Sequence, residues 1–370
     1  MNLKQVNGVT FIDGGVCASK GFRANGIQCG LAHKPLNDTD ENSANAMPAK
    51  KKNDLALIVA DKECTASAVY TTNKVKGAPI LVTKEHIKNG KAKAIIVNSV
   101  NANTCNADGV QKAEKMCSLV ADEMGLNVDD VIVASTGVIG QILPIEPIAN
   151  GMKELVSGLT YDGNSRAVEA IMTTDTQVKE VAVQFELGGK TCTMGGMLKG
   201  SGMIHPNMAT TLTFITTDVD ISAELLQKSL SDVVKITLNR VSDDGDTSTN
   251  DMVCVLANGT AENIPVTKEN QDFEKFVNAL YAVMMNLARK MARDGEGATK
   301  LIECVCHGAD DDKTAEIVAK SVITSSLFKA AMFGEDANWG RILCAVGYAD
   351  ADFDINKVDV SISSDKGSID

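Results

Sequence analysis

The chain has 370 residues, of which 44% are hydrophobic and 23% charged, a balance typical of globular proteins. Its formal net charge of −12 disfavours nucleic acid and anionic membrane surfaces as partners, and no apolar run approaches the ~20 residues that span a bilayer. The N-terminal sequence MNLKQVNGVTFIDGG has neither the apolar core of a signal peptide nor a basic transit pattern. We therefore expect a cytoplasmic protein with no nucleic-acid and no membrane partner.

Short apolar, β-branched runs alternate with helical patterns in the first half of the chain. The runs are bounded by turn residues and predict strands at 54–60, 66–72, 94–100 and 130–135. Apolar residues at helical spacing from Val110 to Met124 predict an amphipathic helix. The polar segment 34–54 has few core-forming residues and two prolines, so we expect it to form an exposed, mobile loop.

The second half continues the mixture of strands and helices. Its patterns predict strands at 210–221, 252–259, 301–309 and 359–364, and helices at 222–241, 273–293 and near 314–332. Strands and helices in this order favour a layered α/β sandwich over a doubly wound nucleotide-binding fold.

Ten cysteines are scattered along the chain without a secretory signal, so we expect free thiols and no disulfides. The densest group is Cys304-Val305-Cys306-His307, in which one residue separates the cysteines where a zinc knuckle has two. We interpret these cysteines as buried thiols of the predicted strand 301–309, and we expect no metal site.

The segment Gly200–Phe214, GSGMIHPNMATTLTF, admits more than one interpretation. The simplest is a glycine-rich turn that leads into a strand. Ser201 does not fit a hydrolase nucleophile, because the nucleophile elbow requires Gly-x-Ser-x-Gly. A phosphate-binding loop does not fit either, because Lys199 precedes the glycines that it should follow.

A further interpretation makes Thr210 a latent N-terminal nucleophile. A threonine hydroxyl needs an adjacent base, and cleavage of the Ala209–Thr210 bond would supply one as the freed α-amine of Thr210. A strained turn would lower the barrier to attack on that bond by the threonine hydroxyl. The local chemistry therefore suits self-cleavage.

The string KGSGMIHPNMATTLTFITTDV closely resembles the self-cleavage segment of the ornithine acetyltransferase family of arginine biosynthesis. The resemblance extends in the family's order over nearly the whole chain, through VNSVNANTC (97–105), STGVIG (135–140), IMTTDT (171–176), DGDTSTND (244–251), RDGEGATK (293–300) and GEDANWGRIL (334–343). It implies an α/β (α+β) layered sandwich of the type shared with self-cleaving aminopeptidases, with its nucleophile at the start of a strand.

The resemblance also implies an activity, that of a glutamate N-acetyltransferase. The precursor would cut itself into an α chain, 1–209, and a β chain, 210–370, which stay associated as a heterotetramer of two α and two β chains. Thr210 would take the acetyl group from N-acetylornithine as an ester and pass it to glutamate. No metal or tightly held cofactor is implied. Acetyl-CoA would be a second acyl donor if the enzyme also makes N-acetylglutamate afresh.

The resemblance assigns roles to individual residues. Thr136 and Gly137 would form an oxyanion hole, whose donors can each contribute ~3–4 kcal/mol to a tetrahedral intermediate. Thr176, Lys199, Thr210 and Glu296 would contact the substrate, and the opposite charges of Lys199 and Glu296 suit an amino acid's carboxylate and ammonium.

Each of these residues also has an ordinary structural interpretation. Lys199 would be a solvated lysine before a turn, Glu296 a helix-end residue, and Thr136-Gly137 a turn after a strand. The segment 244–251 lacks the twelfth-position acid of a calcium loop, so structural hydrogen bonding is expected there. His205 is interpreted as a structural histidine.

The chain departs from the family pattern at several places. Val100 stands where the family has glycine, so the local backbone is expected to differ, and Thr211 stands where methionine is common, which makes it a second candidate nucleophile. The insertion 34–54 is longer than usual. Family chains also continue past 359–364 into a tail that completes the substrate pocket.

These departures leave two rival functions. A hydrolase would release the acyl group from Thr210 to water, as the self-cleaving aminopeptidases do. An inactive truncated remnant would fold or bind without turnover.

Overall fold

The computed structural model describes residues 2–31, 52–205 and 211–369. In this part of the chain a nine-stranded mixed sheet runs in the order β1-β6-β7-β8-β9-β3-β4-β5, with β2 paired to β3. Neighbours are antiparallel except for the parallel pairs β4–β5 and β8–β9. The strands are β1 (Val9–Ile12), β2 (Phe22–Ile27), β3 (Leu55–Tyr70), β4 (Lys91–Asn98), β5 (Val131–Ser135), β6 (Lys179–Leu187), β7 (Lys190–Lys199), β8 (Leu212–Thr217) and β9 (Met252–Ala257).

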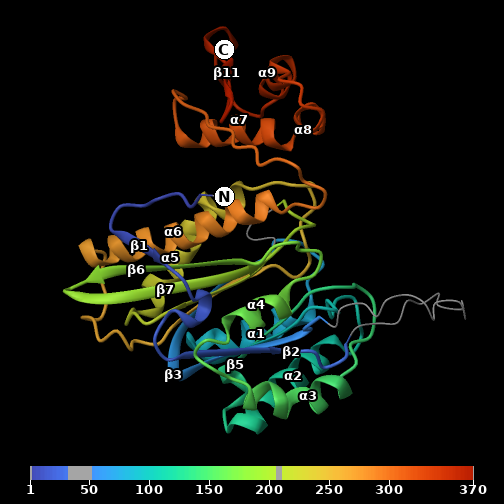
Figure 1. The fold of residues 1–370 in the computed structure, drawn as a ribbon, viewed down its shortest axis with the longest axis vertical. Helices are drawn as coiled ribbons and strands as arrows, with labels where there is room; N and C mark the ends of the chain where they lie inside the picture. The colour runs from blue at the N-terminus through green and yellow to red at the C-terminus, as the bar shows by residue number, and fades with distance from the viewer. Residues whose placement is uncertain (1, 32–51, 206–210, 370) are drawn as a thin grey trace, which may run out of the picture.

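Helices cover the sheet, and the bent sheet packs against itself. One outer core joins β6–β9 to α5 (Ala223–Ile236) and α6 (Gln271–Arg293). The other outer core joins β2–β5 to α1 (Ala78–His86), α2 (Gly109–Met124) and α3 (Glu146–Ser157). A middle core holds residues from both halves of the sheet together with α4 (Asn164–Ile171). Figure 1 shows α5 and α6 beside β6 and β7, with α1 to α4 around β2, β3 and β5. The layered α/β sandwich expected from the sequence is confirmed.

Local signals in the sequence explain where the two long helices of the outer core begin. Asn270 caps α6 by accepting a hydrogen bond from the Phe273 N–H at 3.0 Å, and Ser222 caps α5. Along α6 the buried residues recur every three or four positions and form one apolar stripe, made of Phe273, Phe276, Leu280, Val283, Leu287 and Met291. Helix α6 therefore lies flat against β6 and β7.

Several predicted elements differ from the structure. The segments 54–60 and 66–72 form one long strand, β3, whose register shifts between Val59 and Cys64 so that it can pair with β4 and then with β9. The predicted helix 314–332 is two helices, α7 (Asp312–Thr324) and α8 (Ser326–Phe333), because Ser325 ends the first and caps the second. The hairpin of β6 and β7 was not predicted.

The predicted strand 301–309 is wrong. These residues form neither helix nor strand, and Cys304 and Cys306 are only partly buried, so the interpretation as buried strand thiols is also wrong. The segment leaves the end of α6 and crosses to the last part of the chain, where no strand of the main sheet lies alongside it. Similarly, only Ile362–Ser364 of the predicted strand 359–364 pairs, in a two-stranded hairpin of β10 (Ile362–Ser364) and β11 (Gly367–Ile369).

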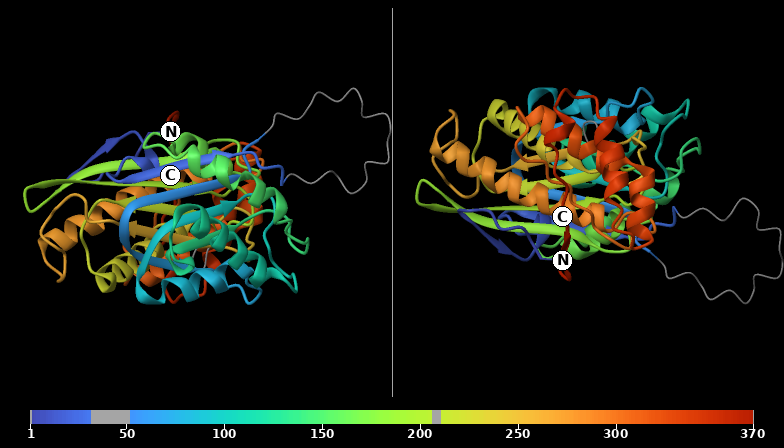
Figure 2. Two further views of the ribbon diagram at one scale, coloured as in Figure 1. Left: turned by 90° about the horizontal axis from the view of Figure 1, so that it is seen from below. Right: turned by 90° about the horizontal axis from the view of Figure 1, so that it is seen from above.

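The residues from α7 onward form a small C-terminal lobe with its own core. Helices α7, α8 and α9 (Trp339–Gly347) enclose Val322, Phe328, Ile342, Ala345 and Val346. The lobe lies beyond α6 at the top of Figure 1, and Figure 2 shows it from above (red) over α6 (orange). Arg240 pairs with Glu316 at 3.1 Å, and this ion pair helps to attach the lobe to the body. Across the described ranges, no helix has the length and apolar character that a membrane span requires.

Candidate active site

A cavity of about 920 Å³ opens where the ends of four strands meet. The strands are β5 and β7 at their carboxyl ends and β8 and β9 at their amino ends. Four of the residues predicted to act on the substrate line it: Thr136, Gly137, Lys199 and Glu296. Their convergence from distant parts of the sequence makes this cavity the candidate active site. Within the described ranges, no three ligand-type side chains are grouped to hold a metal ion.

Thr136 and Gly137 follow β5 in a turn that is built around the backbone of Val100. The Thr136 N–H donates to the Asn98 carbonyl at 3.0 Å, and the Val138 N–H donates to the Val100 carbonyl at 3.0 Å. Between them, the Gly137 N–H and the Thr136 hydroxyl have no hydrogen-bond partner among the described residues. Gly137 has φ +126°, and a Cβ there would lie 2.1 Å from the Val100 oxygen, so only glycine fits. The two donors available in this turn are therefore the Gly137 N–H and the Thr136 hydroxyl.

Val100 does not need the left-handed backbone that its position in the family pattern suggested. The non-glycine residues with positive φ in this region are Asn103, at +49°, and Cys105, at +64°. The Asn98 side chain accepts hydrogen bonds from the N–H groups of Val100 and Asn101 instead. The chain therefore turns at this point without a glycine.

Asn250, which sequence reasoning did not single out, links this turn to the start of β9. Its side-chain amide donates to the Ser135 carbonyl at 2.9 Å and to the Ala102 carbonyl at 2.6 Å. Its carbonyl oxygen accepts from the hydroxyls of Thr104 and Thr249. All four hydrogen-bonding positions of the amide are thus occupied, and the turn after β5 is held against β9. The signal for this residue was the segment 244–251, which was expected to make structural hydrogen bonds.

Lys199, the last residue of β7, carries a buried ammonium group in the cavity wall. The residue is only 9% exposed, and no hydrogen-bond acceptor is found for it among the described residues. Burial lowers its pKa, while the nearby carboxylates of Asp175 and Asp251 oppose that shift. A largely buried lysine that lines the cavity and donates no hydrogen bond to the described residues can receive an anion there, so the solvated-lysine interpretation is wrong.

Asp251 is a second residue of the cavity that sequence reasoning missed. It directly precedes β9 and is 2% exposed, and its Oδ2 has no hydrogen-bond partner among the described residues. Burial raises its pKa well above the usual range, although Ser248, Lys199 and Thr71 partly oppose this. Asp251 lies beside Thr211 in the sheet, because the Met252 N–H donates to the Thr211 carbonyl at 2.8 Å.

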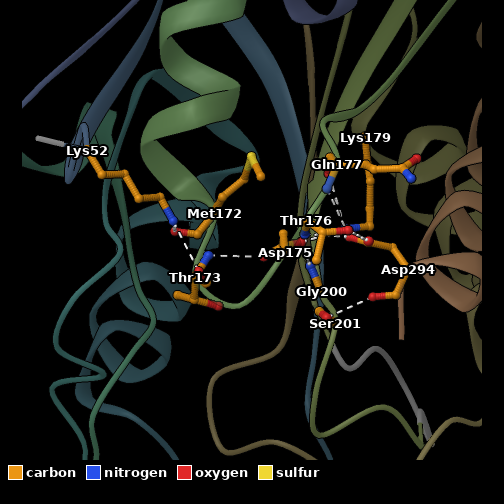
Figure 3. Close-up of polar contacts among 10 residues, drawn as sticks. All are labelled: Lys52, Met172, Thr173, Asp175, Thr176, Gln177, Lys179, Gly200, Ser201 and Asp294. Carbon is orange, nitrogen blue, oxygen red and sulfur yellow. Dashed lines mark hydrogen bonds and ion pairs between the residues drawn. The ribbon is translucent and has the colours of Figure 1, made fainter. Parts of the chain in front are cut away.

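Thr176 is not part of the cavity lining. Its N–H donates to Asp294 Oδ2 at 3.0 Å, and its hydroxyl donates to Asp294 Oδ1 (Figure 3). The neighbouring residues Thr173 and Thr174 line the cavity in its place. Thr176 therefore lies in the loop before β6, against Asp294 at the end of α6 and behind the cavity wall.

Behind that wall lies a buried ion cluster, which we define as Asp175, Lys179 and Asp294. The Lys179 ammonium contacts Asp175 Oδ1 at 2.7 Å and Asp294 Oδ2 at 2.5 Å. Burial by itself would raise the pKa of each carboxyl, but Lys199 and Lys179 hold the pKa of Asp175 below its usual range, and Lys179 and Thr176 do the same for Asp294. Both acids lie in motifs noted above, 171–176 and 293–300, although the motifs did not indicate that they meet.

Glu296 lies over the glycine-rich segment that follows β7. A Cβ on Gly202 would be 2.4 Å from a Glu296 carboxylate oxygen, so glycine is required for this close approach. The Glu296 N–H donates to the Ser201 carbonyl at 3.1 Å. These contacts hold Glu296 at the cavity, and it is not simply a residue at a helix end.

Ala209, Thr210 and residues 34–51 of the loop predicted at 34–54 lie outside the described residues. Thr211, which is described, is buried at the cavity, and its hydroxyl pairs with that of Thr213 at 2.6 Å. His205 Nδ1 lies 2.9 Å from the Ser242 hydroxyl, as suits a structural histidine. In the segment 244–251 the Asp244 carboxylate accepts from the N–H groups of Met203 and Ile204, which confirms the structural hydrogen bonding expected there.

Known proteins are similar to this chain over most of its length. The family model described as the ArgJ family matches residues 41–367. The arginine biosynthesis bifunctional protein ArgJ of Caldanaerobacter subterraneus subsp. tengcongensis is 45% identical over 359 residues, which are 97% of this chain and 85% of that protein. ArgJ 1 of Clostridium acetobutylicum is 47% identical over 88% of this chain and 80% of its own length.

Solved structures of related proteins match part of the chain. The structure of an ornithine acetyltransferase complexed with ornithine, from Mycobacterium tuberculosis, is 31% identical, covers 54% of this chain and 100% of its own, and has a TM-score of 0.47. The family match and the long alignments at 45–47% identity decide the assignment. The chain belongs to the ArgJ family.

Proposed function

We propose that this protein transfers an acetyl group from N2-acetyl-L-ornithine to L-glutamate through an acetyl-Thr210 intermediate, giving L-ornithine and N-acetylglutamate in arginine biosynthesis. The observation that carries the proposal is the cavity itself. Two available donors after β5 and a buried, unpaired ammonium at Lys199 face one space, at the start of the strand that follows Thr210. Relatives named for arginine biosynthesis, at about 45% identity, support the substrate class.

The donors and charges of the cavity suit the steps of acetyl transfer. Attack by the Thr210 hydroxyl on the acetyl carbonyl creates an oxyanion, which would accept hydrogen bonds from the Gly137 N–H and the Thr136 hydroxyl. The C–N bond of the donor then breaks, and ornithine leaves with the proton. Glutamate attacks the ester by the reverse path. Lys199 would bind the α-carboxylate of either amino acid and Glu296 an ammonium group.

Self-cleavage between Ala209 and Thr210 would leave two chains that share one sheet. β7 would belong to chain 1–209 and β8 to chain 210–370, and the two strands are paired along their length. β3 of the first chain also pairs with β9 of the second. These ladders support chains that stay associated after cleavage. A heterotetramer of two such pairs and a location in the cytoplasm complete the proposal.

The relatives' name, bifunctional protein, supports acetyl-CoA as a second acetyl donor. No resident cofactor is proposed, because in this scheme the acyl group is carried by Thr210. Incubation with acetyl-CoA and glutamate, without N-acetylornithine, tests the second activity directly.

The decisive experiment is intact mass under denaturing conditions for the wild type, Thr210→Ala and Thr211→Ala, combined with an acetyl-transfer assay. In the wild type and in Thr211→Ala we expect two fragments, produced by cleavage of the bond between residues 209 and 210. In Thr210→Ala we expect one uncut chain. Acetyl transfer should require glutamate. Acetate release at the same rate without glutamate would make the protein a hydrolase. An uncut, inactive wild-type chain that still binds ornithine would make it a remnant.

A further inference from the structure

Three separate segments that carry the proposed substrate residues meet at the buried ion cluster (Figure 3). They are the loop before β6, which holds Thr176, the end of β7, which holds Lys199, and the turn after α6, which holds Glu296. Strand β6 pairs with β7 as far as Lys179 and Leu198, and α6 packs on β6 and β7, but Thr176 and Glu296 lie beyond the ends of these elements. Their relative placement therefore depends on the contacts of the cluster.

Asp175 fixes the loop before β6 to the end of β7. Its Oδ1 accepts a hydrogen bond from the Gly200 N–H at 2.8 Å, directly beyond Lys199, and its Oδ2 accepts one from the Thr173 N–H at 3.0 Å. The Lys52 ammonium holds the other end of the loop by donating to the Thr173 carbonyl at 3.1 Å. The Asp175 carboxylate thus fixes the backbone at the end of β7, where Lys199 is the last residue of the strand.

Asp294 fixes the turn after α6 to both of these segments. Its carboxylate accepts from the N–H and the hydroxyl of Thr176, and its backbone carbonyl accepts from the Ser201 hydroxyl at 2.7 Å. The Ser201 carbonyl in turn accepts from the Glu296 N–H at 3.1 Å. Ser201 therefore joins the glycine-rich segment after β7 to the turn that carries Glu296, through one hydrogen bond to Asp294 and one from Glu296.

The charges of the cluster also act on Lys199. Burial lowers the pKa of Lys199, and Asp175 is the strongest of the groups that oppose the shift. Asp251 opposes it as well, whereas Lys179 and Lys52 reinforce it. Lys179 lies between the two carboxylates of the cluster, so Asp175 is shared between two ammonium groups.

We propose that the buried ion cluster is the positioning element of the substrate site, in which Asp175 holds the backbone next to Lys199, and Asp294 holds the loop at Thr176 and the turn that carries Glu296. This inference rests on the proposed function, because the property that it explains is substrate binding at the cavity. Asp175 and Asp294 are positioning residues, and neither lines the cavity.

The test is the pH profile of kcat/KM for acetyl transfer in Asp175→Asn. Asparagine keeps an oxygen for the Gly200 N–H but removes the negative charge that acts most strongly on Lys199. The alkaline limb should therefore move to lower pH, with a loss of about tenfold at pH 9 beyond the loss at pH 7. Asp218→Asn is the matched control, since Asp218 is buried, accepts the Thr193 N–H at 2.7 Å, and lies at the other end of β8. An alkaline limb that stays in place in Asp175→Asn overturns the proposal.

Asp294→Asn separates positioning from charge. Asp294 is not among the charges that act on Lys199, so this variant should raise KM about tenfold through release of Thr176 and Glu296 while the alkaline limb stays in place. An unchanged KM overturns the proposal, including when Asp175→Asn fails to fold. Absence of self-cleavage and transfer in the wild type would instead refute the proposed function. A wild type that cleaves and transfers, with both variants unaffected, would refute this inference alone.

Discussion

Gly137 is the residue at which backbone conformation and proposed chemistry coincide most closely. Its φ of +126° and the 2.1 Å approach of a Cβ to the Val100 oxygen exclude every side chain. Gly137 is exposed at the cavity, and the same turn leaves its N–H without a partner among the described residues. Glycine therefore allows a turn whose N–H donor stays available to a ligand in the cavity.

Substitution of Gly137 by alanine should therefore affect catalysis more than stability. The Cβ must displace the turn, so we expect kcat to fall ~10²–10³-fold, as when one oxyanion donor is lost. Gly140→Ala is the control, because Gly140 also has a positive φ of +81° but open space around a Cβ. Gly140→Ala should lower Tm only through the strain of its positive φ and leave kcat within a few fold of the wild type. Equal kcat in the two variants would contradict the oxyanion role.

The buried carboxyl of Asp251, whose Oδ2 has no hydrogen-bond partner among the described residues, predicts how stability changes with pH. Burial raises its pKa in the folded state, whereas the unfolded chain ionises near the ordinary value of about 4. Above that pH the folded state binds more protons than the unfolded state, so this group makes stability fall as pH rises, until it ionises in the folded state. Asp251→Asn removes the effect. The Tm difference, variant minus wild type, should grow from pH 4 to pH 7, and a constant difference would show that the carboxyl is already ionised.

At the scale of elements, the site depends on side chains that join strand ends which are not neighbours along the chain. Asn250 connects the start of β9 to the turns after β4 and β5, with three hydrogen bonds. The buried ion cluster connects the loop before β6, the end of β7 and the end of α6 in the same way. These links place the ends of the strands around one cavity.

Asn250→Ala should therefore impair both stability and catalysis. Two buried carbonyls lose their donor, at about 1–3 kcal/mol each, and the Thr136–Gly137 turn loses its support. Asn263→Ala is the matched control, since Asn263 is buried and donates to the carbonyls of Asp220 and Ile264 away from the cavity. Both variants should lower Tm, but only Asn250→Ala should lower kcat. A kcat loss in both would point to a general effect of instability.

At the scale of the whole molecule, the C-terminal lobe and the sheet body have separate cores. The lobe's core is small and centred on Phe328, and its main link to the body runs through ion pairs and hydrogen bonds such as that between Lys320 and the Asn239 carbonyl at 2.9 Å. Units with separate cores can open independently. We expect the lobe to be the less stable of the two.

Phe328→Ala tests this division. Loss of a buried phenylalanine costs about 3–5 kcal/mol, which is large for so small a core. Hydrogen exchange should accelerate throughout α7, α8 and α9 while β3 and β7–β9 stay protected. Leu327→Ala, a change at the neighbouring exposed residue, should leave both regions protected. Faster exchange in β8 and β9 after Phe328→Ala would show that the two cores unfold together.

Much of the fold could be predicted from the sequence where the signal is local. The stripe of α6, the caps of α5 and α6 and the apolar runs of β4, β5, β8 and β9 follow from periodicity and short-range hydrogen bonding. The predictions failed where tertiary contacts decide. β3 continues through the exposed residues between its two apolar runs because β4 and β9 pair with its two ends, and 301–309 is apolar but has no strand to pair with.

The sequence by itself determined the family, the layered fold and four residues that line the cavity, Thr136, Gly137, Lys199 and Glu296, because each motif keeps its residue types in order along the chain. Only the tertiary structure decided how the motifs meet. In the structure Thr176 contacts Asp294 and does not line the cavity, while the Gly137 N–H and the Lys199 ammonium are available to a ligand. The structure also showed Asp251 and Asn250 at the cavity and the buried ion cluster behind it. The physical reason is that buried charges and amides are held by partners more than 100 residues away in the chain, and no local pattern specifies such partners.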